Sequence, residues 1–245
     1  MRLLALDTTT RDGSAALVVD DRIAVERRGD PSRTHAERLP AEILALLTDQ
    51  RVTLADIDLF AVSSGPGSFT GLRIGIATMQ GLALVAGKPM VGVSALDALA
   101  HTASATRETG ERIGAVMDAH RGEVFAALFE LADARRPQFD LGRLREIEGP
   151  TVGDPRTVLT RWFELGRVTV LVGDGVVRFA DVIAREYRSA RCVPPPLLAG
   201  AIGRLALTRS ARGGAVHPAG VQPLYIRRPD AEIARENSQC GESSR

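Results

Sequence analysis

The sequence predicts an α/β protein made of two similar lobes. Residues 1–28 form three short apolar runs separated by turn residues, which is typical of an antiparallel meander. Residues 32–50 then carry apolar side chains at helical spacing, and a hairpin pattern like the first returns at residues 112–131. We therefore expect each lobe to contain a mixed sheet with a three-stranded meander and flanking helices.

The remaining elements of the first lobe follow in chain order. The helical spacing predicts an amphipathic helix at 33–50, and β-branched and aromatic residues predict a strand at 57–65. A glycine-rich loop then leads into a second helix at 69–87, and residues 89–94 predict the next strand. This order is sufficient for one α/β lobe.

The second lobe is less completely patterned. Residues 167–187 predict a buried strand, a Gly-Asp-Gly turn and a helix, and residues 196–213 predict a last helix that belongs to this lobe or packs back on the first. We assign residues 1–103 to the first lobe and 104–228 to the second. Residues 229–245 lack apolar periodicity, so we expect a disordered tail.

Composition argues against several classes of function. The 31 basic and 30 acidic residues give a net charge of +1, so no overall field attracts nucleic acid or an anionic membrane. The two cysteines form neither a CxxC pair nor a disulfide framework, which favours a reducing cytoplasm. The longest apolar stretch, 74–87, is shorter than the roughly 20 residues that span a bilayer. We expect a cytoplasmic protein with no membrane partner.

The segment SSGPGSFTGLRIG, residues 63–75, superficially resembles a phosphate-binding loop. A P-loop would need lysine and then serine or threonine after Gly71, and a dinucleotide fingerprint would need glycine in place of Thr70. A nucleophile elbow would need glycines two residues before and after Ser68. We interpret the loop as a tight strand-to-helix turn capped by Ser68 or Thr70, in preference to an anion site at the helix start. The small residues that follow predict close packing of this helix.

Four segments together resemble the bacterial TsaB (YeaZ) family: LALDTTT at 4–10, GPGSFTGLRIG at 65–75, GVSALDALA at 92–100 and DAHRGEVF at 118–125. The resemblance implies two ribonuclease H-like lobes of the actin, sugar kinase and Hsp70 class. It also implies a role in making N6-threonylcarbamoyladenosine in tRNA. The implied partners are the catalytic paralogue TsaD and the ATPase TsaE, with tRNA contacted only through the complex and the threonylcarbamoyl-adenylate donor made by a separate enzyme.

The resemblance also bears on catalysis. TsaD carries its metal with an HxxxH pair in the region of the first helix, but here His35 is followed four positions later by Leu39. The other histidines, His101, His120 and His217, do not repeat the spacing. We predict no metal site, no catalytic residue and a non-catalytic subunit. The alternative is an autonomous enzyme of this fold, either ATP-dependent or a glycoprotease-like metallopeptidase.

Nucleotide binding is the closer question. In this fold the first hairpin of each lobe can present donors to phosphates, here from Asp7, Thr8, Thr9 and Asp118, with Gly173 where an adenosine would lie. The same aspartates could instead accept backbone N–H bonds within their turns, and we favour that interpretation. We expect the chain to have no cofactor of its own. If ATP or ADP binds, we expect it at a vestigial site or at one shared with the partner complex.

The resemblance places TsaD against the two first-lobe helices, in a four-helix contact. The candidate contact residues are His35, Leu39, Ile43, Gly71, Arg73, Ile74, Thr78 and Leu82. The same apolar residues could be buried against their own sheet, because each helix must also cover the core of its lobe, and the pattern alone does not separate these roles. If the outer surface is apolar, the chain should form a homodimer when TsaD is absent.

Overall fold

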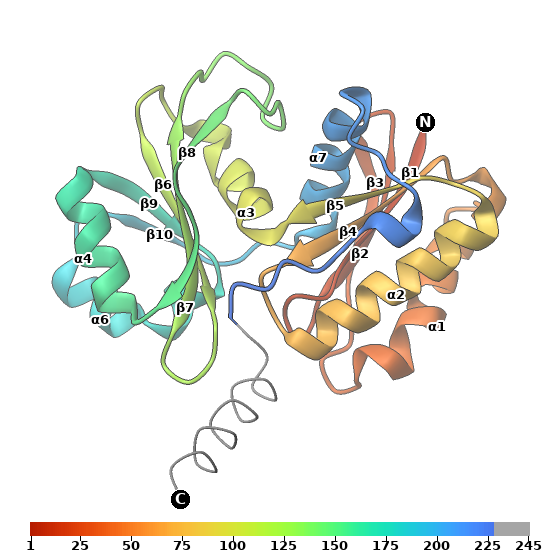
Figure 1. Ribbon diagram of the computed structural model, residues 1–245, viewed down its shortest axis with the longest axis horizontal. Coiled ribbons are helices and arrows are strands. Elements are labelled where there is room, and N and C mark those ends of the chain that lie inside the picture. Colours follow the sequence, from red (N-terminus) through yellow and green to blue (C-terminus); the bar gives the residue numbers. More distant parts are fainter. Residues whose placement is uncertain (228–245) are drawn as a thin grey trace, which may run out of the picture.

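The computed structural model describes residues 1–227 and consists of two lobes, each built on a five-stranded sheet (Figure 1). The predicted disordered tail, 229–245, lies outside the described residues. The first sheet and its outer helices contain β1 (Arg2–Asp7), β2 (Ser14–Val19), β3 (Arg22–Arg28), α1 (His35–Asp49), the 3-10 helix η1 (Leu54–Asp56), β4 (Leu59–Gly65), α2 (Phe69–Ala86) and β5 (Met90–Ser94).

The rest of the described chain forms the second sheet, its helices and the last segments. These elements are α3 (Ala95–Ala103), the 3-10 helix η2 (Ser104–Thr106), β6 (Arg112–Asp118), β7 (Val124–Leu131), β8 (Leu144–Gly153), α4 (Pro155–Leu165), β9 (Val168–Val172), α5 (Asp174–Arg178), α6 (Ala180–Glu186), β10 (Arg191–Val193), α7 (Ala199–Ala211) and the 3-10 helix η3 (Pro218–Gly220). Of these elements, α3, β8, α4 and β10 were not predicted from the sequence.

The two sheets have the same topology, which confirms the prediction of two similar lobes. The strand order is β3-β2-β1-β4-β5 in the first sheet and β8-β7-β6-β9-β10 in the second. In each sheet the first three strands of the lobe are antiparallel and the last two run parallel to the first. The meander at residues 1–28 is therefore correct, and its equivalent in the second lobe is completed by β8.

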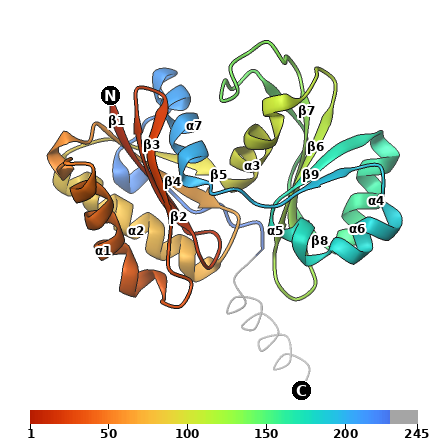
Figure 2. The ribbon, with the colours of Figure 1, turned by 180° about the vertical axis from the view of Figure 1, so that it is seen from behind.

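The elements stack in layers that follow from the alternation of side chains along the central strands. Leu3 and Ala5 on β1 face a core that they share with α3, α7 and the inner face of the second sheet, whereas Leu4 and Leu6 face α1 and α2. A third core around Trp162 lies between the second sheet and α4 to α6. Figures 1 and 2 show α3 and α7 between the two sheets and α1 and α2 on the outer side of the first.

Helix α7 follows the second lobe in sequence but packs on the first sheet, chiefly on β1 and β2. Its N-terminal N–H groups are satisfied by side chains of that sheet. The Ser14 hydroxyl accepts a hydrogen bond from Ala199 N at 3.0 Å, and the Glu26 carboxylate accepts one from Gly200 N at 2.8 Å. A carboxylate at a helix N-terminus also interacts favourably with the helix dipole. These contacts attach the start of α7 to the meander of the first lobe.

The segment after α7 continues across the first lobe to the second. The Gln80 side chain on α2 donates to the carbonyl of Val221 at 3.1 Å, and Leu224 N donates to the carbonyl of Ser64 at 2.7 Å. Arg227 then forms an ion pair with Glu123 at the tip of the β6–β7 hairpin. The last described residues therefore connect the outer helix of one lobe to the other lobe.

Helix α2 lies unusually close to the end of β1, as its small residues predict. Ser68 is the N-cap, and its hydroxyl accepts a hydrogen bond from Gly71 N at 3.2 Å. A Cβ atom on Gly71 would overlap the carbonyl oxygen of Thr8, and one on Gly75 would overlap its hydroxyl oxygen. By contrast, a Cβ on Gly81 would meet no atom within 4 Å.

This difference predicts opposite effects of the same substitution on one helix. Gly81→Ala should raise the free energy of unfolding by about 0.5–1 kcal/mol, because alanine is the better helix former. Gly75→Ala should lower it by about 1–3 kcal/mol, since the overlap with Thr8 outweighs the propensity gain. Urea unfolding measures both values. Combining Gly75→Ala with Thr8→Ala should recover most of the loss, and equal effects of the two glycine substitutions would contradict this account.

Candidate functional site

The first candidate site is an apolar groove between α1 and α2, with a volume of about 670 Å³. It is open to solvent although its walls are hydrophobic: Leu44 is 66% exposed and Val85 is 82% exposed. Within residues 1–227, no charged side chain lines it. The principal lining residues are Ile43, Leu44, Leu47, Thr78, Leu82 and Val85. Contiguous exposed apolar surface of this kind typically marks a contact with another molecule.

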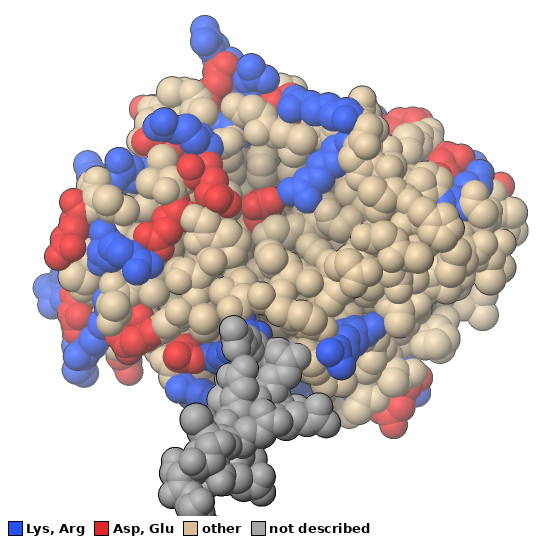
Figure 3. Space-filling model, in the orientation of Figure 1, with Lys and Arg blue, Asp and Glu red and all other residues tan. Residues whose placement is uncertain are grey.

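The surface around the groove is also poor in charge. Arg73 is the one charged residue in the sequence of α2. Figure 3 shows a broad uncharged surface on the side of the first lobe where α2 lies, whereas the second lobe presents acidic and basic side chains in close alternation. Alternating charges are typical of a surface exposed to water, and a broad uncharged surface is less common.

Helix α2 is long and apolar enough, by these two measures alone, to cross a membrane, and 33% of it is buried within the fold. Such a helix is weak evidence for a membrane span, because core helices of soluble proteins pass the same test. Here α2 packs on β4 and β1 and lies beside α1. The apolar side chains of α2 therefore lie in two places, the core of the lobe and the exposed groove.

The structure separates the residues that we predicted for a partner contact into two sets. Leu39 is buried in the core beneath α1, and Gly71 is packed against Thr8, so neither lines the groove. Ile43 is 4% exposed and forms the floor of the groove. The residues that approach the surface are Arg73, Ile74, Thr78 and Leu82.

Sequence analysis missed the two most exposed apolar residues of the groove, Leu44 and Val85. Leu44 lies beside the stripe of core-facing residues on α1, so a search for the buried face of an amphipathic helix passes over it. The signal that could have identified them is that α1 and α2 each carry more apolar residues than one buried stripe requires.

His35, another predicted contact residue, is half-buried, and hydrogen bonds hold its ring in place. Arg38, itself 2% exposed, donates to His35 Nδ1, so the other ring nitrogen must carry the proton, and Nε2 donates to the carbonyl of Thr10 at 3.0 Å. Burial and the charge of Arg38 lower the pKa of His35. Both ring nitrogens are engaged, so this histidine orients the β1–β2 loop and is not available to a metal. No group of three His, Cys, Asp or Glu in residues 1–227 is placed to hold one.

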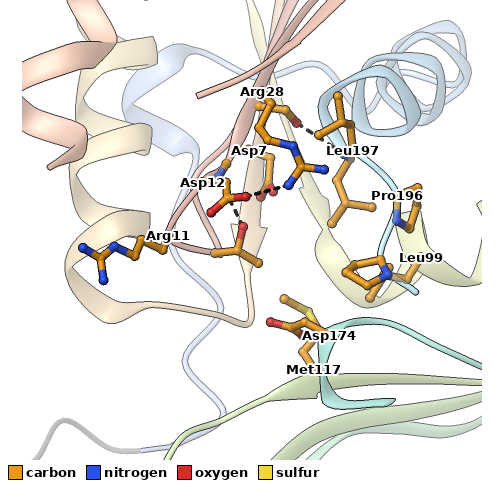
Figure 4. Close-up of a pocket in the computed structure, with 14 residues that line it drawn as sticks. Asp7, Arg11, Asp12, Arg28, Leu99, Met117, Asp174, Pro196 and Leu197 are labelled. Atoms are coloured by element: carbon orange, nitrogen blue, oxygen red, sulfur yellow. Dashed lines mark hydrogen bonds and ion pairs between the residues drawn. The ribbon is translucent and has the colours of Figure 1, made fainter. Parts of the chain in front are cut away.

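The second candidate site is the cleft between the lobes. One cavity there, of about 260 Å³, has Asp7 on its first-lobe wall and Met117 and Asp174 on its second-lobe wall (Figure 4). Arg28 and Asp12 form an ion pair of 2.6 Å in the same wall as Asp7. A neighbouring cavity of about 550 Å³ is lined by Thr9, Ser68, Asp118 and Asp174, among others.

The cleft aspartates accept hydrogen bonds from backbone N–H groups, and Asp7 and Asp118 do so within their own turns. Asp7 Oδ1 accepts from Thr9 N at 3.1 Å and from the Thr9 hydroxyl at 2.8 Å. Asp118 Oδ1 accepts from His120 N at 2.9 Å, and Asp174 Oδ1 accepts from Asp118 N at 3.0 Å. The contacts of Asp7 and Asp118 are the turn contacts that we favoured over phosphate binding, whereas Asp174 joins the start of α5 to the end of β6.

The other two residues proposed for a nucleotide site lie outside the cleft walls. Thr8 is fully buried, and its hydroxyl faces α2, where no acceptor meets it among the described residues. Gly173, with φ of 128°, packs against the carbonyl of Val116. Of the five predicted residues, the structure brings Asp7, Thr9 and Asp118 to the cleft. Asp174, one residue beyond Gly173, joins them from the second lobe.

The burial of Asp7 in the cleft changes its pKa, and the effect on stability can be measured. Burial raises the pKa of Asp7 from 3.8 to about 6, the hydrogen bonds from Thr9 oppose the rise, and the charge of Asp174 adds to it. Because the folded state binds this proton more tightly, Asp7 contributes stability at low pH that is lost as the pH rises through 6. Linkage gives about 3 kcal/mol for the full loss.

We therefore expect the unfolding free energy of the wild type, relative to that of Asp7→Asn, to fall by about 2–3 kcal/mol between pH 4 and pH 7.5. Urea unfolding across this range measures it. Asp181→Asn, an exposed change on α6, is the control. Parallel pH profiles for the wild type and Asp7→Asn would contradict a raised pKa of the buried Asp7 carboxyl.

Comparisons with known proteins agree with this architecture. The family model of TsaD, tRNA N6-adenosine threonylcarbamoyltransferase, matches residues 30–143. A *Pseudomonas aeruginosa* protein described as similar to peptidase YeaZ superposes with a TM-score of 0.75 and 31% identity, covering 92% of this chain and 99% of that one. YeaZ from *P. aeruginosa* gives 0.70 and 29%, covering 91% and 99%.

Two curated relatives extend the comparison to sequence. The tRNA threonylcarbamoyladenosine biosynthesis protein TsaB of *Escherichia coli* (strain K12) is 37% identical over 186 residues, which are 70% of this chain and 78% of the relative. The *Bacillus subtilis* (strain 168) protein of the same name is 30% identical over 165 residues, 67% of this chain and 66% of the relative. Similarity of this extent, on a fold with two equivalent lobes, shows that the chain belongs to the TsaB (YeaZ) family.

Proposed function

We propose that this protein is a non-catalytic subunit in the formation of N6-threonylcarbamoyladenosine in tRNA, and that it binds and supports TsaD. Its place in the pathway is supported by the curated TsaB relatives, whose names state that biosynthesis. The observation that carries the subunit role is the uncharged groove between α1 and α2, with Leu44 and Val85 exposed on its walls. Removing these side chains from water would favour association.

The match to the TsaD family model supports the choice of partner. It covers residues 30–143, a range that contains both α1 and α2. TsaD is therefore expected to present an equivalent pair of helices, and two such pairs can pack face to face as a four-helix contact. Small residues on α2, such as Ala77 and Gly81, would allow the helices to approach closely.

The same groove explains why a homodimer is expected in the absence of TsaD. An apolar surface that fits a related helix pair also fits a second copy of itself about a two-fold axis. We propose that the homodimer and the TsaD complex use overlapping surfaces, so that TsaD displaces the second copy.

The chemistry of the cleft supports a non-catalytic role. His35 has both ring nitrogens engaged, and Asp7 and Asp118 hold their own turns. We propose that the chain holds no nucleotide of its own, and that any ATP or ADP binds at a site shared with the partner complex. We further propose TsaE as a second partner, contact with tRNA only through the complex, and a cytoplasmic location without membrane attachment.

Reconstitution tests the proposed function directly. Threonylcarbamoyl transfer to tRNA is measured with TsaD, TsaE and the enzyme that makes threonylcarbamoyl-adenylate, with and without this chain. We expect transfer to fall to background when the chain is omitted, because TsaD loses the subunit that supports it. Unchanged transfer would overturn the proposal, and so would peptide hydrolysis or tightly bound zinc in the purified chain.

The groove is tested by placing charge on its wall. Val85→Arg should weaken TsaD binding at least about tenfold, because a buried unpaired guanidinium opposes association. Isothermal titration calorimetry measures the dissociation constant. Val177→Arg, at an exposed valine on the second lobe, is the control and should leave binding unchanged. Equal binding by both variants would place the contact elsewhere.

A further inference from the structure

A cluster of planar side chains lies at the start of α2, outside the residues that line the α1–α2 groove. The Arg73 guanidinium carbon lies 4.0 Å from the centre of the Phe69 ring, and Arg73 Nε donates to the Tyr225 hydroxyl at 2.8 Å. The rings of Phe69 and Tyr225 are themselves 5.1 Å apart. All three side chains are exposed, and the two aromatic residues are each 38% accessible.

This arrangement fixes the Arg73 side chain but leaves its two terminal amino groups without acceptors among residues 1–227. Stacking on Phe69 and the bond to Tyr225 fix the plane of the guanidinium, so little side-chain entropy remains to be lost when it binds. No residue among 1–227 accepts a hydrogen bond from its two terminal amino groups or forms an ion pair with it. Those two groups form the fork that binds a carboxylate or a phosphate in a bidentate manner.

The cluster is continuous with the α1–α2 groove. Ala77 lines both that groove and a smaller pocket of about 350 Å³, whose lining includes Arg73, Gln80 and Tyr225 on the other side of α2. A molecule that covers the exposed side of α2 would therefore also cover Arg73. Burying a guanidinium without an anionic partner costs more than the contact returns, so the covering molecule must supply the anion.

The surroundings favour a carboxylate of a protein over a phosphate of a nucleic acid. A nucleic acid backbone carries a charge at every phosphate, and proteins match it with several cations. Here Arg73 is a single cation on an otherwise uncharged helix, beside an apolar groove. One isolated acidic side chain within an apolar contact surface fits this pattern, and exposed Tyr and Arg are typical of the residues that dominate protein contacts.

We propose that Arg73 binds an Asp or Glu carboxylate of the protein that occupies the α1–α2 groove, through two parallel N–H···O bonds. This inference rests on the proposed function, which makes that protein TsaD. Phe69 and Tyr225 are positioning residues that orient the guanidinium. The ion pair sets which end of the partner's helix pair lies at the start of α2, because an apolar groove alone specifies direction weakly.

The test compares TsaD binding by the full chain and by Arg73→Gln, Arg73→Lys and Arg185→Gln across sodium chloride concentrations. Arg73→Gln should weaken binding at least tenfold and flatten its salt dependence, because the pair is lost. Arg73→Lys should restore the salt dependence but only part of the affinity, since lysine cannot form the fork. Arg185→Gln, an exposed change on α6, should match the wild type in both. Circular dichroism melting checks that each variant folds.

The outcomes separate this inference from the proposed function. If the wild-type chain does not bind TsaD, the proposed function fails. If the wild type binds and Val85→Arg weakens binding, but Arg73→Gln binds like the wild type, only the carboxylate contact fails. If Arg73→Gln leaves TsaD binding intact and instead reduces tRNA binding by the assembled complex, the ligand is a phosphate and the inference is overturned.

Discussion

The close approach of α2 to the end of β1 is the constraint on which the surface of the first lobe depends. Gly71 and Gly75 allow the helix to rest against Thr8, with no side chain between the helix and the strand. This contact sets the height of α2 on the sheet and hence the depth of the groove that it forms with α1. The glycines that looked like a phosphate-binding loop therefore serve packing, and through packing they shape an apolar surface.

The layer of α3 and α7 between the two sheets has a comparable role for the cleft. It belongs to a core that both lobes share, so the lobes are joined by burial as well as by the chain. The segment ending at Arg227 adds a second connection through Glu123. The aspartates of the cleft are then held in turns within a well-defined frame, and the burial that this frame imposes raises the pKa of Asp7. The cleft of this chain is organised by turn contacts, while the outer helices carry the surface open to a partner.

Much of the fold could be predicted because it depends on local patterns. The meander, α1, β4, α2 and the hairpin of the second lobe follow from periodicity and turn residues, and Ser68 was correctly named as a candidate cap. Spacing alone excluded the three loop mechanisms. The elements that were missed are α3, β8, α4 and β10. Strand β8 contains Gly149 and Pro150, which interrupt a strand pattern, whereas Asp154 followed by Pro155 was an unused start signal for α4. Helix α3 begins directly where β5 ends, at Ser94.

The candidate site divides in the same way. The sequence by itself determined that the chain has two equivalent lobes, that its glycine loop starts a closely packed helix, and that the histidine pair expected for a metal is broken at Leu39. Only the tertiary structure decided which apolar side chains are core and which are surface. Leu39 and Leu44 lie five residues apart on one helix, yet one is buried against the sheet and the other is open to solvent. Burial depends on what packs against each face of a helix, and those neighbours come from distant parts of the chain.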